Sequence, residues 1–130
     1  MQIDTLNYLF DTRKQEAEKI WGSLPVKMSF GWDTEFPKDR DYAYCTKLSP
    51  QDILIVVAPK ILNAPASRVD GVIRHEIGHA IDMYVPAITI NNVYRMHRLE
   101  PILTPERRAD TLAELTWRHP IYYDDLLVQN

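Results

Sequence analysis

Cysteine and glycine are scarce in this sequence, and long apolar runs are missing. The 130 residues include one cysteine, Cys45, and four glycines. A single cysteine excludes an internal disulfide and a zinc site built from several thiolates, so we expect Cys45 to act as a small buried apolar residue. No run approaches the roughly 20 apolar residues that a membrane-spanning helix needs.

Positive charge is not in excess either. The chain has 15 lysines and arginines against 18 aspartates and glutamates, which gives a formal net charge of -3. Nucleic acids and anionic membranes attract proteins with a basic surplus, so we expect neither as a partner. The first ten residues also lack the basic start and apolar run of a secretory signal, which favours a cytoplasmic location.

The composition predicts a globular protein with one core. Apolar residues make up 45% of the chain, and a chain of this length is within the usual size range of one domain. We therefore expect a single domain over residues 1–130.

Three apolar patterns predict a small sheet after an amphipathic helix over residues 5–21. Residues 26–32 alternate apolar and polar side chains, which is typical of a half-buried strand, and Trp32 would then anchor the core. Residues 42–48 form a second, more polar candidate strand. Residues 53–57 are a continuous β-branched run, which predicts an inner strand covered on both faces. The sequence thus predicts roughly three strands.

A second helix is predicted up to residue 84, before Pro86. Its apolar residues recur at helical spacing, and Ser67 with Asp70 resembles a capping box at its start. Gly78 would let a neighbouring segment approach this helix closely. A last helix is predicted from Pro105 to about Trp117, because a threonine precedes a proline that suits the first helical turn.

The most informative feature is the segment His75-Glu76-Ile77-Gly78-His79 in the middle of the second helix. Residues four apart on a helix share one face, so His75 and His79 can bind one metal ion. Glu76 lies about 100° round the helix from His75 and can flank the ion without binding it. This HExxH spacing is typical of zinc hydrolases.

A catalytic zinc ion usually has three protein ligands, so a third is needed elsewhere in the chain. The position ten residues after His75 is Val85, which excludes the metzincin arrangement with its third histidine. A carboxylate from the last helix is the other common solution. Glu106 is the preferred candidate, and Asp110 and Glu114 are alternatives one and two turns further along the same helix face.

The combination of HExxH with Glu106-Arg107-Arg108-Ala109-Asp110 resembles the gluzincin metallopeptidases, including the membrane-bound CAAX-type proteases and the compact ImmA/IrrE-like peptidases. The resemblance covers residues 74–117. It implies a small α+β zincin-like fold, Glu106 as the third ligand, and Asp110 as the residue that steadies a ligand histidine. Because it lacks membrane helices and a helix-turn-helix extension, the chain resembles a stand-alone minimal peptidase of the kind that bacteria and phages encode more than the membrane-bound group.

These features together predict a zinc metallopeptidase with one Zn²⁺ per chain and a protein or peptide substrate. Glu76 would be the general base. The resemblance also suggests that residues 42–48 form the exposed edge strand to which a substrate backbone adds. Candidates for a second oxyanion donor are Tyr84, Tyr94, His97, His119, Tyr122 and Tyr123.

The alternative is a non-catalytic zincin-like module that binds or regulates a partner and whose metal only holds the fold. A structural zinc ion can supply much of the folding free energy of a small domain. A purely structural site has no need of a base beside the metal, so the presence of Glu76 favours catalysis.

Overall fold

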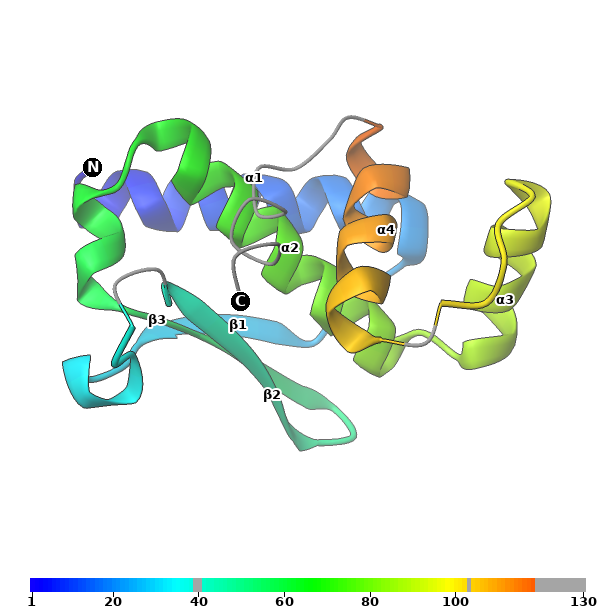
Figure 1. Cartoon of the computed structure of the whole chain (residues 1–130), viewed down its shortest axis with the longest axis horizontal. Helices are drawn as coiled ribbons and strands as arrows, with labels where there is room; N and C mark the ends of the chain where they lie inside the picture. Colours follow the sequence, from blue (N-terminus) through cyan, green and yellow to red (C-terminus); the bar gives the residue numbers. More distant parts are fainter. Residues whose placement is uncertain (39–40, 103, 119–130) are drawn as a thin grey trace.

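A computed structural model describes residues 1–38, 41–102 and 104–118. Within these ranges the chain forms an α+β fold with four α-helices and one three-stranded mixed sheet (Figure 1). The strands are β1 (Val26–Phe30), β2 (Ala43–Ser49) and β3 (Asp52–Val57). Strand β3 lies in the middle, parallel to β1 and antiparallel to β2. The predicted fold class and sheet size are confirmed.

Strand β3 is the inner strand that the sequence predicted. Alternate residues point to opposite faces of a strand, and Ile53, Ile55 and Val57 are fully buried on the face toward the helices. Val56 points to the outer face, where it packs with Phe36 in a smaller apolar cluster. The continuous β-branched run is therefore explained by apolar contacts on both faces.

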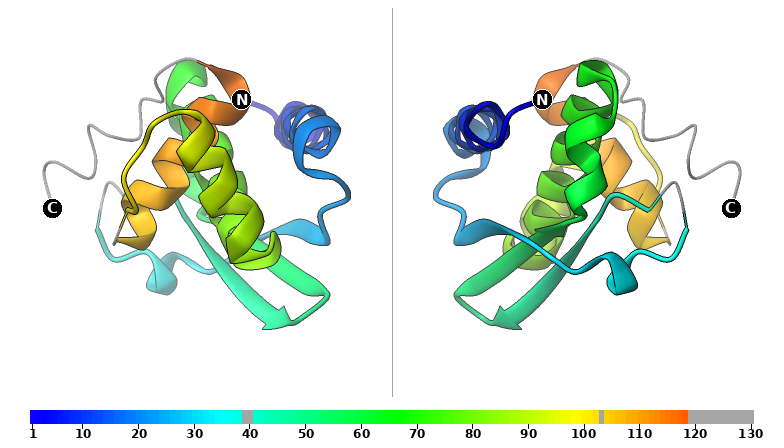
Figure 2. Two further views of the ribbon diagram at one scale, coloured as in Figure 1. Left: turned by 90° about the vertical axis from the view of Figure 1, so that its right-hand side faces the viewer. Right: turned by 90° about the vertical axis from the view of Figure 1, so that its left-hand side faces the viewer.

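Three helices cover one face of the sheet (Figures 1 and 2). They are α1 (Ile3–Trp21), α2 (Ala66–Tyr84) and α4 (Pro105–Trp117). Helix α2 lies between the sheet and its neighbours, and every residue from Gly71 to Ile81 is buried. The HExxH motif therefore lies in the centre of the core, where the positions of its side chains are fixed by packing.

The start of α2 differs from the prediction. The helix begins after Pro65, whose backbone carbonyl accepts a hydrogen bond from the amide of Val69, and no side chain caps it. Ser67 and Asp70 lie inside the helix, so the predicted capping box is wrong. Asp70 instead binds Arg13 of α1, with 2.8 Å between Oδ1 and Nε.

Helix α3 (Ala87–Met96) was not predicted. It follows Pro86 and presents only Ile90 and Tyr94 as buried side chains. Ala87, Ile90 and Tyr94 nevertheless recur at helical spacing, so the sequence did contain a signal for this helix. Figure 1 shows that it extends away from the sheet and from α1. None of the described helices combines the length and the apolar character needed to cross a bilayer.

Trp32 is the clearest error in the predicted core. Strand β1 ends at Phe30, and the Trp32 side chain is 79% exposed. A short 3-10 helix, η1 (Asp33–Glu35), turns the chain here, and Phe36 rather than Trp32 covers Val56. The alternating pattern therefore extends two residues beyond the strand.

Candidate metal centre

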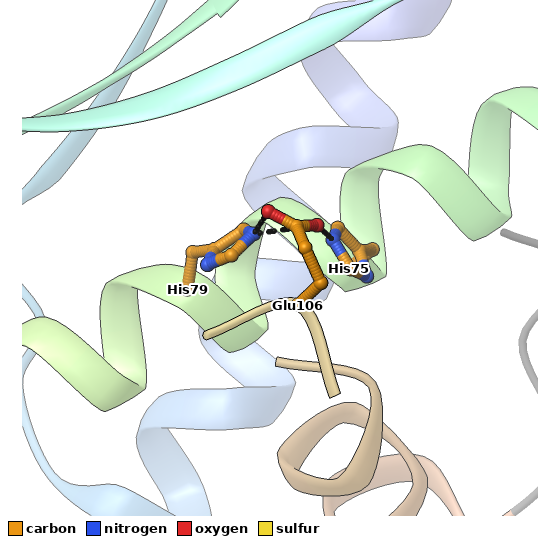
Figure 3. Close-up of side chains that lie close together, drawn as sticks. All are labelled: His75, His79 and Glu106. Atoms are coloured by element: carbon orange, nitrogen blue, oxygen red, sulfur yellow. Dashed lines mark hydrogen bonds and ion pairs between the residues drawn. The ribbon is translucent and has the colours of Figure 1, made fainter. Parts of the chain in front are cut away.

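The structure brings His75, His79 and Glu106 together between α2 and α4 (Figure 3). One potential ligand atom from each lies within 4.8 Å of the others. Nε2 of His75 is 2.9 Å from Oε2 of Glu106, and Nε2 of His79 is 3.2 Å from Oε1 of the same carboxylate. Two imidazoles and one carboxylate thus converge on one point and could hold a metal ion.

The start of α4 positions the carboxylate. Thr104 caps the helix and accepts a hydrogen bond from the backbone amide of Arg107, and Pro105 occupies the first turn, as predicted. Glu106 follows directly, so its side chain projects from the helix end toward the two histidines (Figure 3).

The two alternative ligands take other places. Asp110 contacts the far side of the His75 ring, with 2.6 Å between Oδ1 and Nδ1. Glu114 is exposed, and within the described part of the chain neither residue belongs to the group that could hold a metal. The geometry therefore gives the two carboxylates different positions. Glu106 lies where an ion could bind, and Asp110 lies on the opposite side of the His75 ring.

Asp110 can set the orientation of His75. When Nδ1 of a histidine donates its proton to a carboxylate, the lone pair of Nε2 is left for a metal. His75 is fully buried and Asp110 is 8% exposed, so water competes little for this hydrogen bond. The aspartate thereby holds the ring with Nε2 toward Glu106.

Gly78 explains how α4 comes so close to α2. A Cβ atom at this position would collide with the backbone carbonyl oxygen of Ala109. Because the colliding atom belongs to the backbone, a rotamer change cannot relieve it. The glycine inside the motif therefore permits the helix contact that places Glu106 and Asp110 beside His75, in agreement with the close approach that the sequence predicted.

The metal-free site has strongly shifted proton affinities. Burial disfavours the charged imidazole of His75, but hydrogen bonds with Asp110 and Glu106 and the nearby charge of Glu76 outweigh this effect and raise its pKa to about 9. Hydrogen bonds from both histidines hold the pKa of Glu106 well below its usual range. An anionic carboxylate thus lies between two imidazoles. A metal cation could take the place of the protons that these three groups share.

Glu76 is buried on the same helix, with 2% of its surface exposed. Burial is the main reason that its pKa is raised, and the neighbouring histidines partly oppose this effect. Together with His79 and Glu106 it lines a cavity of about 260 Å³. A desolvated carboxyl group therefore opens onto the space beside the candidate ligands.

Strand β2 forms the other wall of this cavity, through Ala43, Tyr44 and Cys45. Among the described strands, β2 has a neighbour only on the side of β3. Cys45 pairs with Ile55, which faces the helices, whereas Tyr44 pairs with Val56 on the outer face. Residues from both faces line the cavity, so the cavity follows the unpaired edge of the strand.

Sequence reasoning treated Cys45 as inert and did not place Met83 in the site. The thiol of Cys45 is partly buried, lies 3.9 Å from Sδ of Met83, and has its pKa raised by burial. The signal for Met83 was available, because it lies four residues after His79 on the same helix face. The signal for Cys45 required the register of the sheet.

None of the three described candidates for an oxyanion donor lines the cavity beside Glu76. The Tyr84 hydroxyl faces Gln51 at 3.4 Å, Tyr94 is a buried residue of α3, and His97 is exposed at the end of that helix. The other candidates, His119, Tyr122 and Tyr123, lie outside the described residues.

A comparison of the chain with models of known protein families, with curated proteins and with solved structures finds no match. The assignment of a function therefore depends on the residues of the site itself.

Proposed function

We propose that this protein is a zinc-dependent metallopeptidase that hydrolyses peptide bonds in a protein or peptide substrate. The observation that carries the proposal is the convergence of His75, His79 and Glu106 within 4.8 Å, next to the buried carboxyl group of Glu76 in one cavity. The resemblance of residues 75–79 and 106–110 to the gluzincin motifs supports the same proposal, although it rests on the same residues.

The donor atoms suit zinc. Two imidazole nitrogens and one carboxylate oxygen are a common ligand set of catalytic zinc sites, which leave a fourth position open. Mn²⁺, Co²⁺ and Ni²⁺ accept the same donors, but two histidines with one carboxylate in an HExxH context favour zinc. Asp110 behind His75 supplies the outer hydrogen bond that ligand histidines usually make.

Bound zinc would lower the pKa of a water molecule toward about 7 and polarise the scissile carbonyl group. Glu76 takes the proton from the attacking water and later gives it to the nitrogen of the leaving amine. Burial raises the pKa of this carboxyl group in the metal-free site, and its position beside the candidate ligands puts it within reach of a water molecule there.

The unpaired edge of β2 is the natural place for the substrate backbone. An extended peptide that adds to a free strand edge gains main-chain hydrogen bonds along its length. Because the same edge borders the cavity that contains Glu76 and Glu106, a peptide bound there passes the candidate ligands.

The first test is metal content. We expect the purified wild-type protein to bind one zinc ion per chain by elemental analysis, and Glu106→Ala to lose most of it. Glu114→Ala is the matched control, because Glu114 is an exposed glutamate of the same helix and its loss should leave the zinc in place. A wild-type protein that stays metal-free after zinc is supplied would disprove the proposal.

The second test separates catalysis from a structural metal. We expect Glu76→Gln to keep its zinc and to reduce peptide hydrolysis about 100- to 10,000-fold, the usual contribution of a positioned acid and base. If the wild type binds zinc but cleaves none of a broad peptide mixture, the non-catalytic module becomes the better interpretation.

A further inference from the structure

Tyr44 stands at the rim of the candidate active site and faces outward. It lines the cavity together with Glu76 and Glu106, yet it pairs with Val56, so its side chain lies on the outer face of the sheet. With 38% of its surface exposed, its ring is open to a ligand on the free side of β2.

This ring is held in place from two directions. The Tyr44 hydroxyl donates a hydrogen bond of 2.8 Å to Oε1 of Glu35. Phe36 packs against the ring, with 5.6 Å between the ring centroids and a tilt of 30°. The other carboxylate oxygen of Glu35 accepts the backbone amide of Trp32, so η1 as a whole supports the tyrosine.

A substrate strand on the free edge of β2 has a fixed relation to this ring. Directly opposite residues on neighbouring strands place their Cβ atoms about 5 Å apart on the same face. The substrate residue opposite Tyr44 must therefore point outward, beside the ring. The substrate residues on either side of it point toward the helices.

We infer that Tyr44 is a specificity-determining residue that selects a substrate with an aromatic or large apolar side chain at the position paired with it. The inference rests on the proposed function and on the binding of the substrate as a strand. Aromatic and β-branched partners gain most from cross-strand pairing with an aromatic residue. Because Glu35 and Phe36 already immobilise the ring, a substrate side chain loses little free energy in ordering it.

The two substrate residues next to the one opposite Tyr44 would point toward the helices and contact other residues of the cavity. Cys45 points toward the helices and contacts Met83, and Glu76 lies in the same cavity. Further along β2, Nζ of Lys47 donates a hydrogen bond of 3.2 Å to the carbonyl oxygen of Met83. This bond joins β2 to α2 at a position outside the cavity lining. The part of the β2 edge that borders the cavity is therefore the part that contains Tyr44.

The test is the cleavage profile of zinc-loaded protein on synthetic peptides in which each position near the cleaved bond is varied. We expect the wild type to prefer aromatic or large apolar side chains at one fixed position. Tyr44→Ala should reduce kcat/KM for those peptides about 2- to 10-fold, the range of a single aromatic pair, and should leave the preferences at other positions unchanged. Tyr44→Phe keeps the ring and should keep the preference.

Tyr8→Ala is the control, because Tyr8 is a 73% exposed tyrosine of α1 that lies outside the cavity lining. Should Tyr44→Ala fail to fold, Tyr44→Thr replaces it with a β-branched residue that favours strands. A Tyr44 variant that cleaves with an unchanged profile, or that loses activity equally on all peptides, overturns the inference while the proposed peptidase stands. A zinc-loaded wild type that cleaves no peptide overturns both.

Discussion

The two walls of the cavity differ in how their polar groups are satisfied. On the wall formed by α2 and α4, His75 and Glu76 are almost completely buried, and both nitrogens of His75 have carboxylate partners. On the wall formed by β2, the strand edge has no neighbouring strand among the described residues, and Tyr44 is partly exposed. The α2 and α4 wall therefore holds buried, paired charges, whereas the β2 wall offers the free backbone groups of a strand edge.

Because the two walls differ in this way, we expect substitutions on them to change different properties of the protein. Removing one partner of a buried charged pair leaves an uncompensated charge in the interior, which is costly. Changes on the α2 and α4 wall should therefore alter metal affinity and stability. Changes at Tyr44 on the β2 wall should mainly alter which peptide is accepted, because substitutions at exposed positions usually cost little stability.

Gly78→Ala should have the largest effect on the wall formed by α2 and α4. The new methyl group would collide with the Ala109 carbonyl oxygen, so α4 must shift away from α2. We expect a loss of about 1 to 3 kcal/mol in the free energy of unfolding, as is usual for overpacked sites, together with weaker zinc binding. Urea unfolding and a competitive zinc titration measure the two effects. Unchanged values in both would show that the helix contact does not depend on this glycine.

Asp110→Asn should weaken the site without moving the helices. The amide is similar in size to the carboxylate but carries no charge to hold the Nδ1 proton of His75. Zinc affinity should fall about 10- to 100-fold, the usual effect of losing such a partner. Asp82→Asn is the matched control, because Asp82 binds Arg108 between the same two helices and not a candidate ligand. Equal losses in the two variants would contradict a specific role for Asp110.

The pH dependence should separate the metal-free protein from the loaded one. The pKa of His75 is raised from 6.5 to about 9, so its charged form stabilises the metal-free fold fully below about pH 6.5, and this stabilisation is lost as the pH rises through 9. Zinc requires the neutral imidazole. Its affinity should therefore rise over the same range, by up to about tenfold per pH unit for one displaced proton.

Thermal unfolding with and without zinc, measured from pH 6 to 9.5, tests this opposition. The melting temperature of the metal-free protein should fall with rising pH, while the increase caused by zinc should grow. Parallel curves would mean that His75 is not protonated in the metal-free site.

How much of the site was predictable depends on how far apart its residues are in the sequence. The helical spacing of His75 and His79 fixes their common face, so the local sequence was sufficient for them. The choice among Glu106, Asp110 and Glu114 was not local, because it depends on where α4 crosses α2 at Gly78. The resemblance to gluzincins implied the first two roles. The structure brings Glu106 to both histidines and Asp110 to Nδ1 of His75, and the roles themselves stay predictions.

The two fold errors have different origins. The alternating pattern through Trp32 describes local preference, but η1 and Phe36 decide that the tryptophan stays outside the core. In this place the structure is decided by contacts that a local pattern does not contain. The omission of α3 is different, because Ala87, Ile90 and Tyr94 recur at helical spacing and the signal was present in the local sequence.

Tyr94→Phe should give the smallest effect. It compares α3, which has only two buried side chains, with the wall formed by α2 and α4. Tyr94 is 3% exposed, and its hydroxyl has no hydrogen-bond partner among the described residues. A buried polar group without a partner costs free energy, so its removal should raise the free energy of unfolding by up to about 1 kcal/mol. Zinc affinity should not change, because α3 contributes no candidate ligand. A destabilised variant in urea unfolding would show instead that the hydroxyl is hydrogen-bonded in solution, for example to a water molecule in the adjoining cavity beside Asp82.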